Sequence, residues 1–78
     1  MAVPVAIPQH GWEMQEAVLL EWLVADGAAI SAGQPLYVLG TDKVDEQIEA
    51  PADGVVRIKG VEGETYAVGH VIAEIDQG

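Results

Sequence analysis

The stretch DGAAISAGQPL (residues 26–36) recurs in altered form as EGETYAVGHVI (residues 62–72). In both copies an acidic residue precedes a glycine, followed in register by a large apolar residue, a second glycine and an aliphatic residue. The offset, from Gly27 to Gly63, is 36 residues. Units of this size cannot bury an apolar face alone. The repeat therefore predicts two halves related by a pseudo-two-fold axis, forming two packed sheets that each draw strands from both halves.

Glycine and proline break the chain into short β-prone runs and leave little room for long helices. The runs are residues 3–7, 18–24, 36–39, 47–50, 55–58 and 71–75. They predict an all-β sandwich or barrel. In the second run Leu19, Leu20 and Trp22 supply apolar side chains to both faces, which either a β-bulge or two-sided burial explains. At the repeat offset, Leu20 falls opposite Val56.

Length and composition limit the fold further. A chain of 78 residues suffices for one compact domain but not for two cores, so we expect a single domain over residues 1–78. Half of the residues are hydrophobic, but only two Trp and two Tyr are aromatic and no Phe occurs, so the core must be built mainly from Val, Ile, Leu and Ala. The absence of cysteine excludes disulfides and thiolate metal sites.

The chain is strongly acidic, with 13 Asp and Glu against 3 Lys and Arg and a formal net charge of −10. This charge repels nucleic acids and anionic membrane surfaces, so neither is an expected partner. No apolar stretch approaches the length of a membrane span, and no signal peptide is recognisable. We expect a soluble protein of the bacterial cytoplasm, or of the mitochondrial matrix if the source is eukaryotic.

The polar segment 40–45 joins the two halves between the β-prone runs 36–39 and 47–50. It is predicted to form an exposed hairpin turn with Lys43 at its tip. At the repeat offset, position 43 falls on the two chain ends, so Lys43 should lie opposite the termini. On spacing alone, Lys43 is an ordinary solvated turn lysine.

The residues around Lys43 resemble the lipoyl-attachment motif of 2-oxo acid dehydrogenase acyltransferases. The motif comprises Thr41-Asp42-Lys43-Val44, followed by Ile48-Glu49-Ala50-Pro51 and Gly54. Further matching positions span nearly the whole chain: Ile7, Pro8, Gly11, Met14, Glu16, Trp22, Gly27, Glu62, Gly63, Val68 and Gly69. An Asp-Lys pair alone is uninformative, whereas this ordered set is highly specific.

The resemblance implies a flattened eight-stranded β-barrel of two four-stranded antiparallel sheets. It also implies that Lys43 carries lipoate in amide linkage. The residues implied to present this lysine are Thr41, Asp42 and Val44 in the turn, with Gly27 and Gly54 in support.

The same resemblance implies a carrier domain that performs no catalysis itself and belongs to a dihydrolipoamide acyltransferase. Its partners would be a lipoylating enzyme, a thiamin-diphosphate-dependent dehydrogenase, an acyltransferase and a flavin-dependent dihydrolipoamide dehydrogenase. The lipoyl arm would shuttle acyl groups and reducing equivalents between their active sites. Pyruvate, 2-oxoglutarate, branched-chain and acetoin complexes all stay open. We expect an N-terminal piece of a longer acyltransferase that is monomeric when isolated.

Two departures from the family pattern stand out. Gly40 occupies a position where lipoyl domains usually carry Glu, which affects recognition by the lipoylating enzyme, and Ala17 replaces a common Gly. Two other functions are compatible with such a fold. Biotinyl domains typically place Met on both sides of the lysine, whereas Asp42 and Val44 stand here. An unmodified β-barrel interaction module would tolerate loss of Lys43.

A loop before the second strand contains Gly11, Trp12 and Glu13, and in this family such a loop lies beside the lipoyl-lysine and helps the dehydrogenase recognise its carrier. Trp12 is either an exposed partner anchor or a cover for the barrel edge. The spacing of His10, Glu13 and Glu16 matches no closed zinc site, so no metal is expected.

Overall fold

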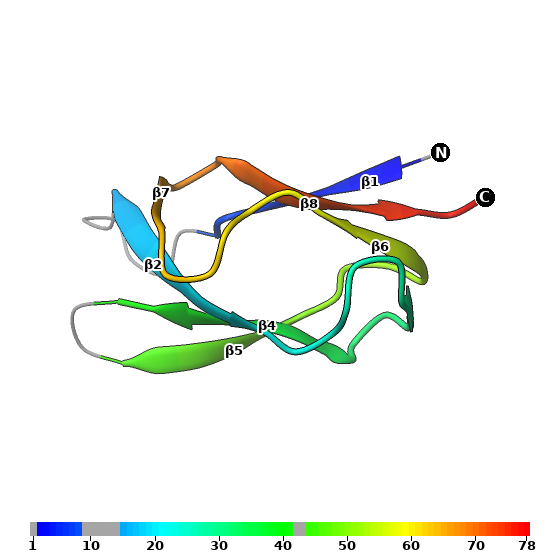
Figure 1. Cartoon of the computed structure of the whole chain (residues 1–78), viewed down its shortest axis with the longest axis horizontal. Coiled ribbons are helices and arrows are strands. Elements are labelled where there is room, and N and C mark those ends of the chain that lie inside the picture. The colour runs from blue at the N-terminus through cyan, green and yellow to red at the C-terminus, as the bar shows by residue number, and fades with distance from the viewer. Residues whose placement is uncertain (1, 9–14, 42–43) are drawn as a thin grey trace.

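The computed structural model describes residues 2–8, 15–41 and 44–78. Its strands are β1 (Ala2–Ala6), β2 (Glu16–Trp22), β3 (Ala29–Ile30), β4 (Pro35–Gly40), β5 (Asp45–Glu49), β6 (Gly54–Ile58), β7 (Thr65–Ala67) and β8 (Val71–Asp76). They form two four-stranded antiparallel sheets, sheet A in the order β1-β8-β6-β3 and sheet B in the order β5-β4-β2-β7 (Figure 1). The predicted all-β class and two-sheet architecture are confirmed. Within the described ranges, no helix is long and apolar enough to cross a membrane.

The two sheets are related by the sequence repeat. Replacing each strand of sheet A by the strand four places away in the chain gives the order of sheet B. Loop hydrogen bonds recur as well. The N–H of Ala28 donates to the carbonyl of Ala25 over 3.1 Å, and 36 residues later Glu64 donates to Val61 over 3.2 Å. The predicted pseudo-two-fold symmetry, with strands exchanged between halves, is confirmed.

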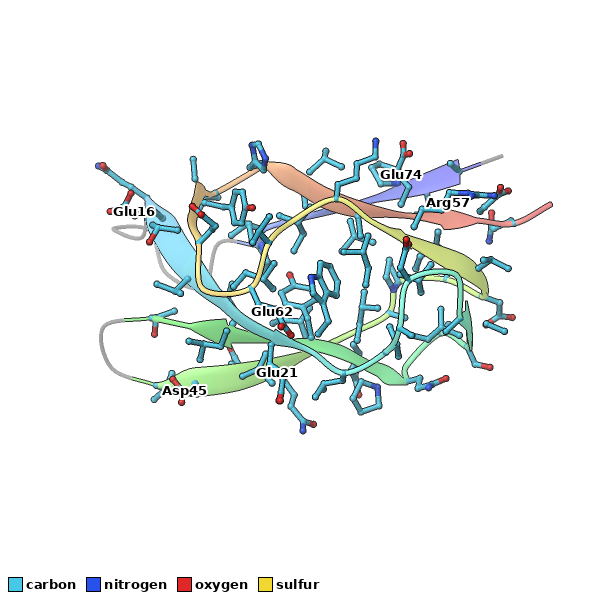
Figure 2. All side chains as sticks on the ribbon, in the orientation of Figure 1. Glu16, Glu21, Asp45, Arg57, Glu62 and Glu74 are labelled. Atoms are coloured by element: carbon cyan, nitrogen blue, oxygen red, sulfur yellow. The ribbon has the colours of Figure 1, made fainter. Side chains whose placement is uncertain are left out.

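Each half also holds a strand of the other half through one carboxylate. Asp26 accepts a hydrogen bond from the N–H of Ile58 on β6 over 2.8 Å. Glu62, labelled in Figure 2, accepts one from the N–H of Trp22 on β2 over 2.7 Å. Asp26 and Glu62 are the acids that open the two copies of the repeat. Their recurrence has a structural reason, because each satisfies a backbone donor of the partner half.

Strand β2 contains a bulge at Leu20. Leu19 pairs with Leu39 of β4 and Glu21 pairs with Val38, so the register shifts between them. Leu19 is fully buried, whereas Leu20 is 39% exposed. Of the two explanations for this apolar run, the bulge is therefore the correct one.

The bulge also corrects the internal alignment of the halves. The N–H of Leu19 donates to Glu64 and that of Val56 donates to Ala28, at distances of 3.0 and 2.9 Å. Leu19 is thus the counterpart of Val56, and the predicted match of Leu20 with Val56 is wrong by one position. The cause is the extra residue in β2, which β6 lacks.

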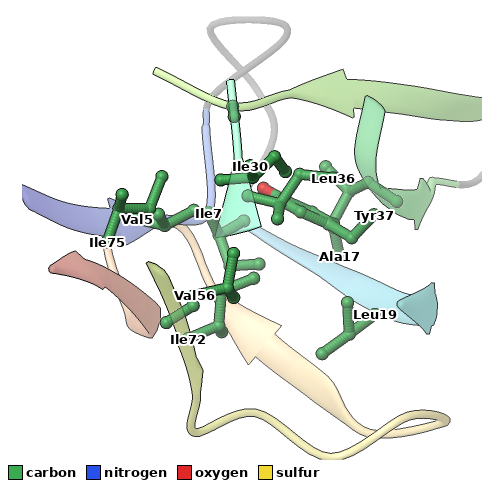
Figure 3. Packing of buried hydrophobic residues seen from close by; sticks show 13 residues of the cluster. Val5, Ile7, Ala17, Leu19, Ile30, Leu36, Tyr37, Val56, Ile72 and Ile75 are labelled. Atoms are coloured by element: carbon green, nitrogen blue, oxygen red, sulfur yellow. The ribbon is translucent and has the colours of Figure 1, made fainter. Parts of the chain in front are cut away.

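The core lies between the two sheets (Figure 3). Its buried residues are Val5, Ile7, Ala17, Leu19, Ile30, Leu36, Tyr37, Leu39, Ala50, Val56, Ile72, Ala73 and Ile75. This set matches the predicted aliphatic core with one exception, the fully buried aromatic ring of Tyr37. The ring packs against that of half-buried Trp22, with centroids 5.4 Å apart and planes inclined by 57°.

Two strands do not correspond to any predicted run. Strand β3 has two residues and β7 has three, and they pair with β6 and β2 respectively. Both lie inside the repeat copies, between positive-φ glycines with φ near 87°. Strands this short carry no alternation that a sequence pattern could reveal.

Candidate functional site: the β4–β5 hairpin

The predicted turn is shorter than the segment 40–45, because Gly40 and Asp45 are paired residues at the ends of β4 and β5. The N–H of Thr41 donates to the carbonyl of Val44 over 2.9 Å. The Thr41 hydroxyl donates to the same carbonyl over 3.0 Å and accepts from the N–H of Val44 over 3.3 Å. Thr41 and Val44 therefore close the hairpin, and only two residues of sequence separate them.

Those two residues, Asp42 and Lys43, lie outside the described part of the chain. Their flanking residues locate the site. The β4–β5 hairpin is at one end of the long axis, and the ends of β1 and β8 are at the other (Figure 1). The Val44 side chain is 56% exposed. The predicted separation of the hairpin from the chain ends is thus confirmed for the residues that flank Lys43.

The charges around this end of the molecule are acidic. Glu16 and Asp45 lie toward the hairpin end, whereas Arg57 and Glu74 lie toward the chain ends (Figure 2). Arg57 of β6 pairs with Asp76 of β8 over 3.1 Å. Lys59, which directly follows β6, pairs with Glu74 of β8 over 3.0 Å. Lys59 is thus a solvated surface residue. In the described ranges, every Lys or Arg side chain is engaged on sheet A.

The Asp76 carboxylate shows how this opposite end is held. Hydrogen bonds from the Gly78 N–H and from the Arg57 guanidinium lower its pKa below the ordinary value. The Asp76 side chain is partly exposed, and its hydrogen bonds hold the end of β8 at the end of the molecule away from the hairpin.

The two glycines expected to support the turn lie away from it. The N–H of Gly27 donates to Val56 over 2.7 Å, and Gly54 pairs with Ile30 of β3. A Cβ on Gly54 would lie 2.5 Å from the carbonyl oxygen of Asp76, at the end of β8. Gly27 and Gly54 therefore shape the edge of sheet A, and the structure does not bring them to the Thr41–Val44 turn.

Tyr37 is a polar residue whose position the sequence did not reveal. Its hydroxyl is buried and has no hydrogen-bond partner among the described residues. Burial raises the pKa of this hydroxyl to about 12. Tyr37 is sealed inside the core and thus takes no part in chemistry at the hairpin.

Other sequence candidates have no structural test. Gly11, Trp12 and Glu13, predicted for partner recognition, lie outside the described residues, and so does His10. Among the residues that are described, no group of three or more His, Asp or Glu side chains could hold a metal ion. His70 lies in the loop before β8, where its ring stacks on Tyr66 with centroids 4.9 Å apart.

Residues 3–75 match the biotin/lipoyl family model, which is described as "Biotin-requiring enzyme". The chain is 40% identical over 76 residues to the dihydrolipoyllysine-residue acetyltransferase component of the pyruvate dehydrogenase complex of Corynebacterium glutamicum, covering 96% of this chain and 11% of that protein. It is 32% identical over 79 residues to the succinyltransferase component of the 2-oxoglutarate dehydrogenase complex of Rickettsia felis, covering all of this chain and 20% of that protein.

Among solved structures, the lipoyl domain of the 2-oxoglutarate dehydrogenase complex of Azotobacter vinelandii superposes with a TM-score of 0.80. It is 25% identical, and the match covers 97% of this chain and 98% of that domain. Two packed sheets that each contain strands of both halves, with the β4–β5 hairpin at one end, thus define the class of small all-β lipoyl-type domains. The chain belongs to the biotin/lipoyl attachment family. It spans 11 to 20% of the length of these two curated relatives.

Proposed function

We propose that this chain is a lipoyl carrier domain and that lipoate is attached through an amide to the Nζ atom of Lys43. The observation that carries the proposal is the hairpin closed by Thr41 and Val44. Lys43 is one of only two residues between them, at an end of the molecule where Val44 is largely exposed. The closed hairpin provides a firm base for a modified side chain, and the neighbouring Val44 is accessible from solvent.

Lipoate is favoured over biotin by the residues and the relatives. The names of the curated relatives specify dihydrolipoyllysine. Asp42 and Val44 flank the lysine, in place of the paired methionines typical of biotinyl domains. Biotin is the second candidate, because the matching family includes biotin-requiring enzymes.

When bound, lipoate supplies a dithiolane that can be reduced and acylated. The chain itself contributes position and charge. Thr41 holds the hairpin closed, and the two packed sheets give it a rigid base. Amide formation at Lys43 removes one positive charge and makes the net charge of −10 more negative. Tethering replaces diffusion of a free carrier by a high effective concentration at the next active site.

The proposed setting is a 2-oxo acid dehydrogenase complex, in which residues 1–78 act as the carrier domain of an acyltransferase component. Relatives from pyruvate, 2-oxoglutarate and acetoin systems support this setting without selecting one of them. The proposed partners are the lipoylating enzyme, the thiamin-diphosphate-dependent dehydrogenase, the acyltransferase and dihydrolipoamide dehydrogenase. The corresponding location is the bacterial cytoplasm or the mitochondrial matrix.

Intact-mass measurement tests the attachment. The domain is incubated with a lipoylating enzyme, lipoate and ATP, alongside a parallel reaction with a biotinylating enzyme and biotin. We expect one lipoyl increment, its loss in Lys43→Ala and its retention in Lys59→Ala, which removes the only other side-chain amine. A folded wild-type domain that gains no lipoyl group, or gains biotin instead, would contradict the proposal.

A further inference from the structure

A row of residues crosses all four strands of sheet B next to the hairpin. Val18 of β2 pairs with Thr65 of β7 on one side and with Gly40 of β4 on the other, and Gly40 pairs with Asp45 of β5. Paired residues in such a row project from the same face of a sheet. Because Gly40 has no side chain, the row has a gap between Val18 and Asp45. This gap lies at the base of the hairpin.

The gap forms a groove of about 260 Å³. Its apolar part includes Val18 and Leu20, and the Leu20 side chain lies so close over Gly40 that a Cβ there would be 2.9 Å from it. Its polar part includes the carboxylates of Glu16 and Asp45, which lie on strands β2 and β5. The groove thus combines an apolar surface with two negative charges from separate strands.

Both acidic residues of the groove are exposed, and neither has an ion pair or side-chain hydrogen bond within the described part of the chain. Arg57 and Lys59 are engaged by Asp76 and Glu74 on the other sheet. The proposed amide at Lys43, two residues after Thr41 in the sequence, would also remove one positive charge from the domain. Neither Arg57 nor Lys59, the Lys and Arg residues of the described ranges, is thus available to the groove, and we look for a positively charged occupant on another molecule.

We propose that the groove binds one arginine side chain of an enzyme that acts on the hairpin. The methylene stem packs on Leu20 and Val18, and the guanidinium binds the carboxylates of Glu16 and Asp45. Arginine suits this site because its planar fork can serve carboxylates from two directions. The inference rests on the proposed function in one respect: lipoylation identifies the partner as an enzyme that must reach this end of the domain.

An NMR titration of the isotope-labelled, unlipoylated domain tests the groove directly. The probe is N-acetyl-arginine amide at constant ionic strength, and N-acetyl-citrulline amide is its uncharged counterpart. We expect concentration-dependent shifts of the backbone amides of Leu20, Gly40 and Thr41. In the double variant Glu16→Gln/Asp45→Asn, the initial slope of these shifts should fall by about three- to tenfold, as for loss of two exposed ion pairs.

The matched control is Glu21→Gln/Glu49→Gln, which removes the same charge from the far ends of the same two strands. Its slope should change by less than about twofold, since most exposed charges act over only about a Debye length of 8 Å. Gly40→Ala would bring a Cβ within 2.9 Å of the Leu20 side chain and so displace Leu20, which should weaken the shifts. Equal losses in both double variants, shifts elsewhere, or equal shifts with the citrulline probe would overturn the proposal.

The titration needs no lipoate, so its failure is distinguishable from failure of the mass experiment. In reductive acylation by the dehydrogenase component, Glu16→Gln/Asp45→Asn should raise KM for the lipoylated domain by about three- to tenfold with kcat retained. The control pair should leave both constants within about twofold. A loss of kcat at unchanged KM would contradict a binding role for the groove.

Discussion

At the scale of single residues, the Tyr37 hydroxyl is buried without a hydrogen bond in the described structure. An unsatisfied buried hydroxyl costs about 1–3 kcal/mol. Replacing Tyr37 by Phe should therefore raise the free energy of unfolding at pH 7 by about 1–2 kcal/mol, measured by urea denaturation. Tyr66→Phe is the control and should lower the free energy of unfolding, because the Tyr66 hydroxyl accepts a hydrogen bond from the Val61 N–H over 2.8 Å.

The raised pKa of Tyr37 predicts that the fold loses stability at alkaline pH. Burial raises the pKa of Tyr37 from 10.0 to about 12, so folding favours the neutral phenol. This contribution is complete below pH 10 and is lost as the pH rises toward 12, by roughly 3 kcal/mol at most. Tyr37→Phe should remove this loss from the pH dependence of urea unfolding. An unchanged alkaline profile in the variant would show that other groups cause it.

Thr41 acts on the site through the hairpin rather than through contact with the cofactor. Thr41→Val keeps the shape of the side chain but removes both hydroxyl hydrogen bonds to Val44. We expect the rate of lipoylation to fall about three- to tenfold while stability falls by about 1 kcal/mol or less. Thr41→Ser should restore the rate. Ser31→Ala, which removes a hydroxyl from the loop between β3 and β4, serves as the control, and an equal effect there would argue against a special role for Thr41.

At the scale of elements, the two carboxylates that bind the opposite half are equivalent by symmetry. Asp26→Ala and Glu62→Ala should each destabilise the fold by about 1–3 kcal/mol, because each removes a charge-assisted hydrogen bond to a strand. Glu21→Ala, an exposed acid on β2, should change stability by less than about 0.5 kcal/mol. Chemical denaturation followed by Trp fluorescence measures all three. A marked inequality between Asp26→Ala and Glu62→Ala would contradict the equivalence.

The elements also show what the sequence could and could not predict. The glycine-spaced repeat predicted two halves that share both sheets, because the turn glycines and the apolar residues between them recur at one interval. The bulge at Leu20 could not be distinguished from burial on both faces, since consecutive apolar residues are compatible with either structure. The strands β3 and β7 were missed because two or three residues show no period.

The candidate site was predictable in part for similar reasons. Lys43 was nominated by its motif and its place between two strands, and the flanking Thr41 and Val44 form the expected hairpin. The groove beside it could not be predicted, because it depends on which residues pair with Gly40 across sheet B. Burial of Tyr37 likewise depends on packing against Trp22 from another strand. Such contacts between distant residues leave no local pattern.

At the scale of the whole molecule, the pseudo-symmetry makes two places equivalent, but the hairpin occupies only one of them. The pseudo-two-fold operation that exchanges the sheets carries the hairpin between β4 and β5 onto the place where β8 and β1 lie side by side. At that second place no turn joins the two paired strands, because β1 is the first strand and β8 the last in the order of the fold. A duplicated fold would ordinarily offer every surface feature twice. Within residues 2–8, 15–41 and 44–78, a closed hairpin occurs at one of the two equivalent places, so we expect the proposed modification to add one arm per domain.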